Sequence, residues 1–204
     1  MSLNYAVNYT SEEEYLENEQ ISDIKHEYID GVCYAMAGAS RNHNQLSQTV
    51  SRLFGNHLDD TKCGVYSSDM KVKIADETSS KFFYPDVLVA CDDDNGNDYY
   101  TNKPRIIVEV LSKGTRRIDK TLKLAAYKTI TSLQEYVLIE QDFAEIEVCR
   151  RNNQWISEHY FLGDDVTFES IDLTLSVEAI YRRVQNQDVL EYLESQTKTE
   201  THEH

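Results

Sequence analysis

The chain has little of what makes a protein flexible or membrane-bound. Its 204 residues include only two prolines and seven glycines, so no proline- or glycine-rich linker divides the sequence. No apolar run approaches the ~20 residues that a membrane-spanning helix needs. The first residues, Met1 to Tyr5, carry neither the basic region nor the apolar core of a signal peptide. These absences predict one folded domain that is located in the cytoplasm and has no membrane partner.

Basic residues are also scarce, and the formal net charge is −16. A protein that coats nucleic acid contacts many phosphates through Lys and Arg, so the overall charge argues against that class. The basic residues are unevenly spread, however, because 8 of the 20 lie between Lys103 and Lys128. A solvated helix face explains such a cluster equally well. A local basic patch on an acidic protein favours transient contact with a phosphate chain.

Four cysteines occur, and no two of them have the short spacing of a zinc knuckle or a redox motif. Four reduced and mostly buried thiols are the expectation for a cytoplasmic protein. The four are Cys33, Cys63, Cys91 and Cys149.

Hydrophobic periodicity predicts a mixed α/β fold. Asp30-Gly31 between two apolar runs is typical of a hairpin, and apolar steps of three and four predict helices over 42–58 and 115–129. Central strands are expected over 84–90, 105–111 and 136–139, followed by a β extension. Together these elements predict one domain over residues 1–187, in which helices flank a central sheet. Residues 188–204 are polar and are expected to form a frayed tail.

Two carboxylates interrupt the apolar strands, Asp86 in the first and Glu109 in the second. A carboxylate within an apolar strand is costly unless something pairs with it. If the strands are neighbours, both side chains meet near the strand ends. Mg²⁺ or Mn²⁺ prefers such oxygen ligands, and the backbone carbonyl of Val110 is available as a further one. The pattern therefore predicts a metal site of the kind that hydrolyses phosphodiesters.

A lysine near such a metal stabilises the charge that develops on the phosphate. Lys123 is the candidate, because the helix that carries it is expected to pack back over the sheet. Asp119 lies four residues earlier, on the same helix face. A weak surface ion pair is the simpler interpretation of this spacing when it is taken alone. The two strand acids favour the functional interpretation.

Several separated motifs resemble the Uma2 family of the PD-(D/E)XK, or restriction-endonuclease-like, superfamily. They are Tyr84-Pro85-Asp86, Val108 to Ser112, the helix positions Thr115, Asp119, Lys123 and Tyr127, Glu135-Tyr136, His26 to Gly31, Met36 to Ser40 with His43-Asn44, and Ser68-Asp69. The resemblance covers roughly residues 10 to 183. It implies a restriction-endonuclease-like αβββαβ core with an N-terminal hairpin and a C-terminal β extension.

The resemblance also implies site residues. Asp86 and Glu109 match the acids of the family, and Lys123 matches its relocated lysine, because Leu111 occupies the usual lysine position. Glu27 and His43 match positions that line the same pocket, although a strand ion pair and a helix-start residue explain them equally well.

The function predicted from these residues is Mg²⁺- or Mn²⁺-dependent endonucleolytic cleavage of DNA. The basic residues expected to contact phosphate are Lys113, Arg116, Arg117 and Lys120. A homodimer is expected, since one site per chain cuts one strand, with Tyr28 and Tyr34 of the hairpin as a contact surface. Two alternatives stay open: a catalytically silent scaffold or nucleic-acid-binding module, and a hydrolase of another phosphodiester.

Overall fold

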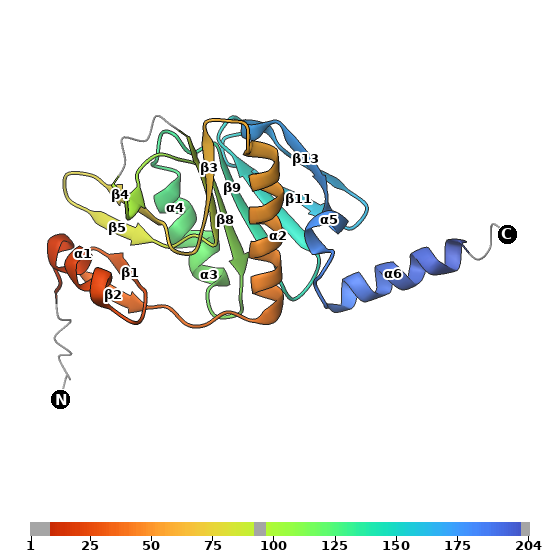
Figure 1. Ribbon diagram of the computed structural model, residues 1–204, viewed down its shortest axis with the longest axis horizontal. Coiled ribbons are helices and arrows are strands. Elements are labelled where there is room, and N and C mark those ends of the chain that lie inside the picture. The colour runs from red at the N-terminus through yellow and green to blue at the C-terminus, as the bar shows by residue number, and fades with distance from the viewer. Residues whose placement is uncertain (1–8, 92–96, 201–204) are drawn as a thin grey trace.

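A six-stranded mixed sheet forms the centre of the computed structural model, which describes residues 9–91 and 97–200 (Figure 1). Its order is β11-β10-β9-β8-β6-β3, in which β8 and β9 are parallel and the other neighbours antiparallel. The predicted α/β class is confirmed. The strands are β3 (Cys63–Ser67), β6 (Val87–Cys91), β8 (Pro104–Leu111), β9 (Glu135–Glu140), β10 (Glu145–Arg150) and β11 (Ser157–Phe161).

A second sheet of order β2-β1-β5-β4-β7 carries the N-terminal hairpin. The predicted turn at Asp30-Gly31 is confirmed, with φ of 47° and 96° at the two residues. Positive φ at both central positions is what a two-residue hairpin turn requires, and glycine adopts it without strain. The strands are β1 (His26–Ile29), β2 (Val32–Ala35), β4 (Lys71–Ala75), β5 (Ser80–Phe83) and β7 (Tyr100–Thr101).

Helices lie on both faces of the central sheet (Figure 1). The long helix α2 (Arg41–Leu58) covers one face, beside the two-stranded sheet of β12 (Asp165–Phe168) and β13 (Leu173–Ser176) and the short helix α5 (Val177–Tyr181). The other face carries α3 (Arg116–Ile118), a π-helical turn over Asp119–Lys123, and α4 (Leu124–Tyr127). Helix α1 (Glu12–Ile21) packs on the second sheet through Tyr15, and a 3₁₀ turn spans Glu169–Ile171. Within the described ranges, no helix is both long and apolar enough to cross a bilayer.

The alternation of side chains along β8 divides the core into two. Val108 and Val110 point into the cluster under α2, whereas Ile107 and Leu111 point into the cluster under α4. Glu109 lies between Ile107 and Leu111 and therefore shares their face. The strand thus presents one carboxylate to an otherwise apolar layer.

The C-terminal region corrects an expectation. Residues 188–204 are expected to be a frayed tail, but the structure has helix α6 over Gln187–Glu200, which projects away from the sheet (Figure 1). Asn186 caps it by accepting a hydrogen bond from Val189 N at 3.0 Å, and Val189 is buried. Asp188 accepts a bond from Ala144 N at 2.9 Å, which fixes the first turn to the core. The apolar residues Val189, Leu190 and Leu193 have the spacing of one face of a helix. Residues 201–204 lie outside the described residues.

Two further expectations are wrong. Cys63 and Cys91 form a disulfide between β3 and β6, because the register places them directly opposite each other; only Cys33 and Cys149 are free thiols among the described residues. Tyr28 is buried against Tyr15, at 4.9 Å between ring centroids, so it is unavailable as a contact surface. Tyr34 is half exposed.

Removing an aromatic ring from the α2 layer tests this core. Phe54 is fully buried and packs edge-on against Phe168, at 4.8 Å between ring centroids. Phe54→Ala should lower the free energy of unfolding by about 3–5 kcal/mol, measured by urea denaturation. Phe161→Ala is the control, because its ring is half exposed, and it should change stability little. Equal effects of the two changes would contradict the assigned core.

Candidate functional site

Two acids meet across neighbouring strands. The antiparallel register of β6 and β8 pairs Val87 with Val108; Asp86 lies immediately before Val87, and Glu109 immediately follows Val108. Glu109 lies on the face of the sheet that α4 covers, whereas the Asp86 carboxylate contacts His43 in the first turn of α2, the helix that covers the other face. Glu109 is buried, whereas the Asp86 side chain is 17% exposed at the edge of the site.

Both oxygens of Asp86 are engaged. Oδ2 accepts a hydrogen bond from the backbone N–H of Val110 at 2.7 Å. Oδ1 lies 2.7 Å from Nε2 of His43, in the first turn of α2. The Asp86 carboxylate is consequently fixed by groups from two different elements, β8 and α2.

Lys123 lies at the centre of three carboxylates. Its Nζ is 2.8 Å from Glu27 Oε1, 3.2 Å from Glu109 Oε1 and 3.2 Å from Asp119 Oδ1. Its side chain is only 7% exposed, so the Asp119–Lys123 pair is not the surface ion pair of the simpler interpretation. Both residues belong to the π-helical turn, a rare feature that occurs frequently at functional sites.

The charges of this cluster do not balance. Burial would by itself lower the pKa of Lys123, but the carboxylates around it, above all Glu109, raise that pKa and keep the ammonium charged. Burial raises the pKa of Glu109 well above its usual value, and Lys123 offsets only part of this. One ammonium thus faces three acids, with Asp86 as a fourth acid close to Glu109. The cluster holds more acidic than basic groups, and a cation would stabilise the ionised forms of those acids.

The donor chemistry fits a hard divalent cation. Glu27 Oε1 and Asp119 Oδ1 are buried, and each of them pairs with the ammonium of Lys123. Among the residues that the structure describes, no group of three or more His, Cys, Asp or Glu side chains is arranged to hold a metal ion. Mg²⁺ needs no such group, because one or two carboxylates with water and substrate phosphate usually bind it. Asp86 and Glu109 supply that number.

The predicted phosphate contacts divide into two classes. Arg116 donates to Glu140 Oε1 at 2.7 Å and also pairs with Asp142, and Lys120 pairs with Glu147 at 2.9 Å. These two cations are engaged within the fold, which the sequence could not indicate because their partners lie on or beside β9 and β10. Lys113 and Arg117 are exposed and make no ion pair with a described residue.

Two buried residues with polar groups near the site are not among the site residues predicted from the sequence. Tyr127 donates a hydrogen bond to Glu109 Oε1 at 3.3 Å, and its position in the motif pattern was the one hint. Gln141 follows β9, and its Nε2 donates to the carbonyl of Leu111 at 2.9 Å. Nothing local in the sequence distinguishes Gln141 from a surface glutamine.

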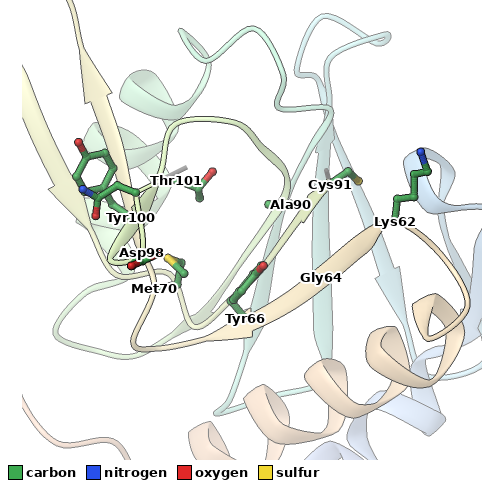
Figure 2. A pocket seen from close by; sticks show the side chains of 10 residues that line it. Lys62, Gly64, Tyr66, Met70, Ala90, Cys91, Asp98, Tyr100 and Thr101 are labelled. Atoms are coloured by element: carbon green, nitrogen blue, oxygen red, sulfur yellow. The ribbon is translucent and has the colours of Figure 1, made fainter. Parts of the chain in front are cut away.

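Two cavities among the described residues lie away from this cluster. One of them has a volume of about 350 Å³ and is lined by residues that include Tyr66 of β3, Tyr100 of β7 and Met70, which precedes β4; Figure 2 shows these side chains. Another, of about 490 Å³, lies between β4 and α4 and is lined by Ile74 and Leu122. None of the four acids or Lys123 lines either cavity, so the candidate site is defined by its charges and contacts.

The fold is that of a nuclease-like α/β protein. It resembles the crystal structure of a "putative nuclease belonging to DUF820" from Anabaena variabilis, with a TM-score of 0.67, 16% identity, and coverage of 83% of this chain and 96% of that one. The Uma2 family, described as "Putative restriction endonuclease", matches residues 12–178. The chain belongs to the Uma2 family, and the resemblance seen in the sequence is confirmed.

Relatives occur in Synechocystis sp. The protein slr1290 is 38% identical over 175 residues, covering 84% of this chain and 91% of its own length. The protein sll1609 is 39% identical over 162 residues, covering 76% of this chain and 89% of its own length. Both are described as uncharacterised.

Removing the central cation should destabilise the fold. Lys123→Met leaves two buried carboxylates, of Glu109 and Asp119, and the half-buried Glu27 without their counter-ion, and breaking a buried pair from one side costs about 3–5 kcal/mol. Lys128→Met is the matched control, because Lys128 forms no ion pair with a described residue. Urea denaturation at pH 7 measures both. A Lys123 variant as stable as the wild type would contradict the central role of this lysine.

A pH series tests whether Lys120 serves the fold. Burial tends to raise the pKa of Glu147, but hydrogen bonds from Ser157 and Lys120 outweigh it and lower that pKa. The stability from Glu147 is therefore present above its usual pKa near 4.5 and lost as the pH falls through the lowered value. Lys120→Met should cost about 0.5–1 kcal/mol at pH 7, and less at pH 3. An effect independent of pH would contradict this pairing.

Proposed function

We propose that the protein is a metal-dependent endonuclease that hydrolyses the phosphodiester bonds of DNA. The observation that supports this proposal is that Asp86 and Glu109 directly adjoin the paired residues Val87 and Val108 of neighbouring strands, and that Glu109 contacts the buried ammonium of Lys123. Membership of a family described by nuclease activity supports a nucleic-acid substrate.

Asp86, Glu109 and the carbonyl of Val110 would hold Mg²⁺ or Mn²⁺. When bound, the ion lowers the pKa of a water molecule and neutralises charge on the phosphate. Lys123 orients Glu109 through their direct contact, and its positive charge opposes the negative charge that builds up at the site during cleavage. Tyr127 donates to the same Glu109 oxygen and restricts its rotation.

Two exposed basic residues near the site are available to bind the phosphates of the substrate. Lys113 follows the end of β8 closely, and the exposed Arg117 lies on α3, so both are proposed to contact phosphates. The net charge of −16 keeps this contact transient. Because Arg116 and Lys120 are held by acids of the fold, we assign them no contact with substrate.

We also propose a homodimer, since two sites are needed to cut both strands of a duplex. A cytoplasmic location fits a DNA substrate. The Cys63–Cys91 disulfide is the observation that weighs against that location, because such bonds are more typical of oxidising compartments.

Neutralising one acid tests the function. Asp86→Asn keeps the size of the side chain but removes its charge, and it should reduce Mg²⁺-dependent nicking of plasmid DNA by on the order of 10²–10³. Asp69→Asn is the matched control, because this carboxylate is 82% exposed and pairs with Lys25, away from the candidate site. Nicking is measured with Mg²⁺, with Mn²⁺ and with a chelator, on DNA and on RNA.

The outcomes separate the alternatives. Cleavage by the wild type and by Asp69→Asn, but not by Asp86→Asn, supports the proposal. Cleavage of RNA but not of DNA would identify RNA as the substrate and contradict the assignment of DNA. If the wild type cleaves neither polymer with either metal, the silent-scaffold alternative gains. Equal cleavage by Asp86→Asn would show that the site lies elsewhere.

A further inference from the structure

We propose that His43 is a positioning residue that fixes the orientation of the Asp86 carboxylate, and that the buried Gln141 holds His43 in place. This inference rests on the proposed function, because it concerns the acid that would hold the divalent ion. It gives His43, in the first turn of α2, a role in orienting Asp86 in addition to its place at the start of the helix.

The contact itself is short and specific. Nε2–H of His43 donates to Oδ1 of Asp86 at 2.7 Å, while Val110 N–H donates to Oδ2 at 2.7 Å. The His43 side chain is only 16% exposed, so solvent competes little for this bond. A carboxylate bonded through both oxygens to groups on two elements has one preferred orientation. Each oxygen still keeps a lone pair for another partner.

The first turn of α2 is fixed in turn to β8. Ser40 is the N-cap, and its Oγ accepts a hydrogen bond from His43 N at 3.1 Å. The hydroxyl of Ser40 donates to Oε1 of Gln141, and Nε2 of Gln141 donates to the carbonyl of Leu111 at 2.9 Å. Leu111 is two residues beyond Glu109 on the same strand. A continuous chain of contacts therefore links the two acids through α2.

This series of hydrogen bonds does more than cap a helix. Capping needs only the Ser40 hydroxyl and a backbone N–H. The side chains of His43 and Gln141 reach past the cap, to the strands that carry Asp86 and Glu109 respectively. Hydrogen bonds that orient a ligand carboxylate typically change metal affinity by 10–100-fold when they are removed.

The affinity for Mn²⁺ tests the proposal, measured by isothermal titration calorimetry without nucleic acid. His43→Leu should weaken Mn²⁺ binding by roughly 10–100-fold. His43→Gln keeps an N–H donor at a similar reach and should restore most of the affinity. If His43→Leu does not fold, His43→Asn serves instead, because its shorter amide does not reach Asp86.

His57→Leu is the matched control. His57 lies on the same helix and its Nε2 is 2.8 Å from the carbonyl of Ile171, far along α2 from the acids. It should leave Mn²⁺ affinity unchanged even if it lowers the melting temperature. Tighter binding by His43→Gln than by His43→Asn at similar melting temperatures separates positioning from stability.

A metal-free measurement separates this inference from the proposed function. In ¹⁵N-labelled protein, NMR should show a proton on Nε2 of His43 whose signal shifts in Asp86→Asn and not in Asp69→Asn. If the wild type binds Mn²⁺ and His43→Leu binds it equally well, the positioning role is wrong and the proposed function stands. If the wild type binds no Mn²⁺ but the NMR signal of His43 shifts in Asp86→Asn, the metal-dependent function fails and the contact between His43 and Asp86 stands; an unchanged signal in Asp86→Asn would overturn the positioning role.

Discussion

The ion cluster around Lys123 is the interaction on which the rest of the structure depends. One buried ammonium contacts Glu27 from β1, Glu109 from β8 and Asp119 from the π-helical turn. It thereby joins the second sheet, the central sheet and the helical layer at one point. Because each acid would be costly to bury alone, the three elements are stable together only with the lysine between them. The same cluster holds more acidic than basic groups beside Asp86.

The sequence predicted the parts of the site that follow from strand periodicity. Asp86 and Glu109 each adjoin an apolar run, and the pairing of Val87 with Val108 brings these two positions to neighbouring strands. The hairpin turn at Asp30-Gly31 was equally readable, because only certain residues adopt its backbone angles. These features are local, and local spacing encodes them. The roles of the residues stay predictions.

Long-range contacts could not be predicted in the same way. Gln141 joins Ser40 across 101 residues, and neither residue differs in type from an ordinary surface residue. The pairing of Cys63 with Cys91 follows from the register of β3 and β6, which the spacing of the cysteines does not reveal. For the same reason the sequence predicts phosphate contacts for Arg116 and Lys120, since their acidic partners Glu140 and Glu147 lie on strands that follow much later in the sequence.

The central claim is that Asp86 and Glu109 together bind a divalent cation. A crystal of the protein soaked in Mn²⁺ tests it most directly, because the anomalous scattering of manganese locates the ion independently of the protein atoms. The account predicts a single strong peak between the two carboxylates, with the carbonyl of Val110 as a further ligand. A well-ordered site with no peak there, or a peak held by other residues, would contradict the account.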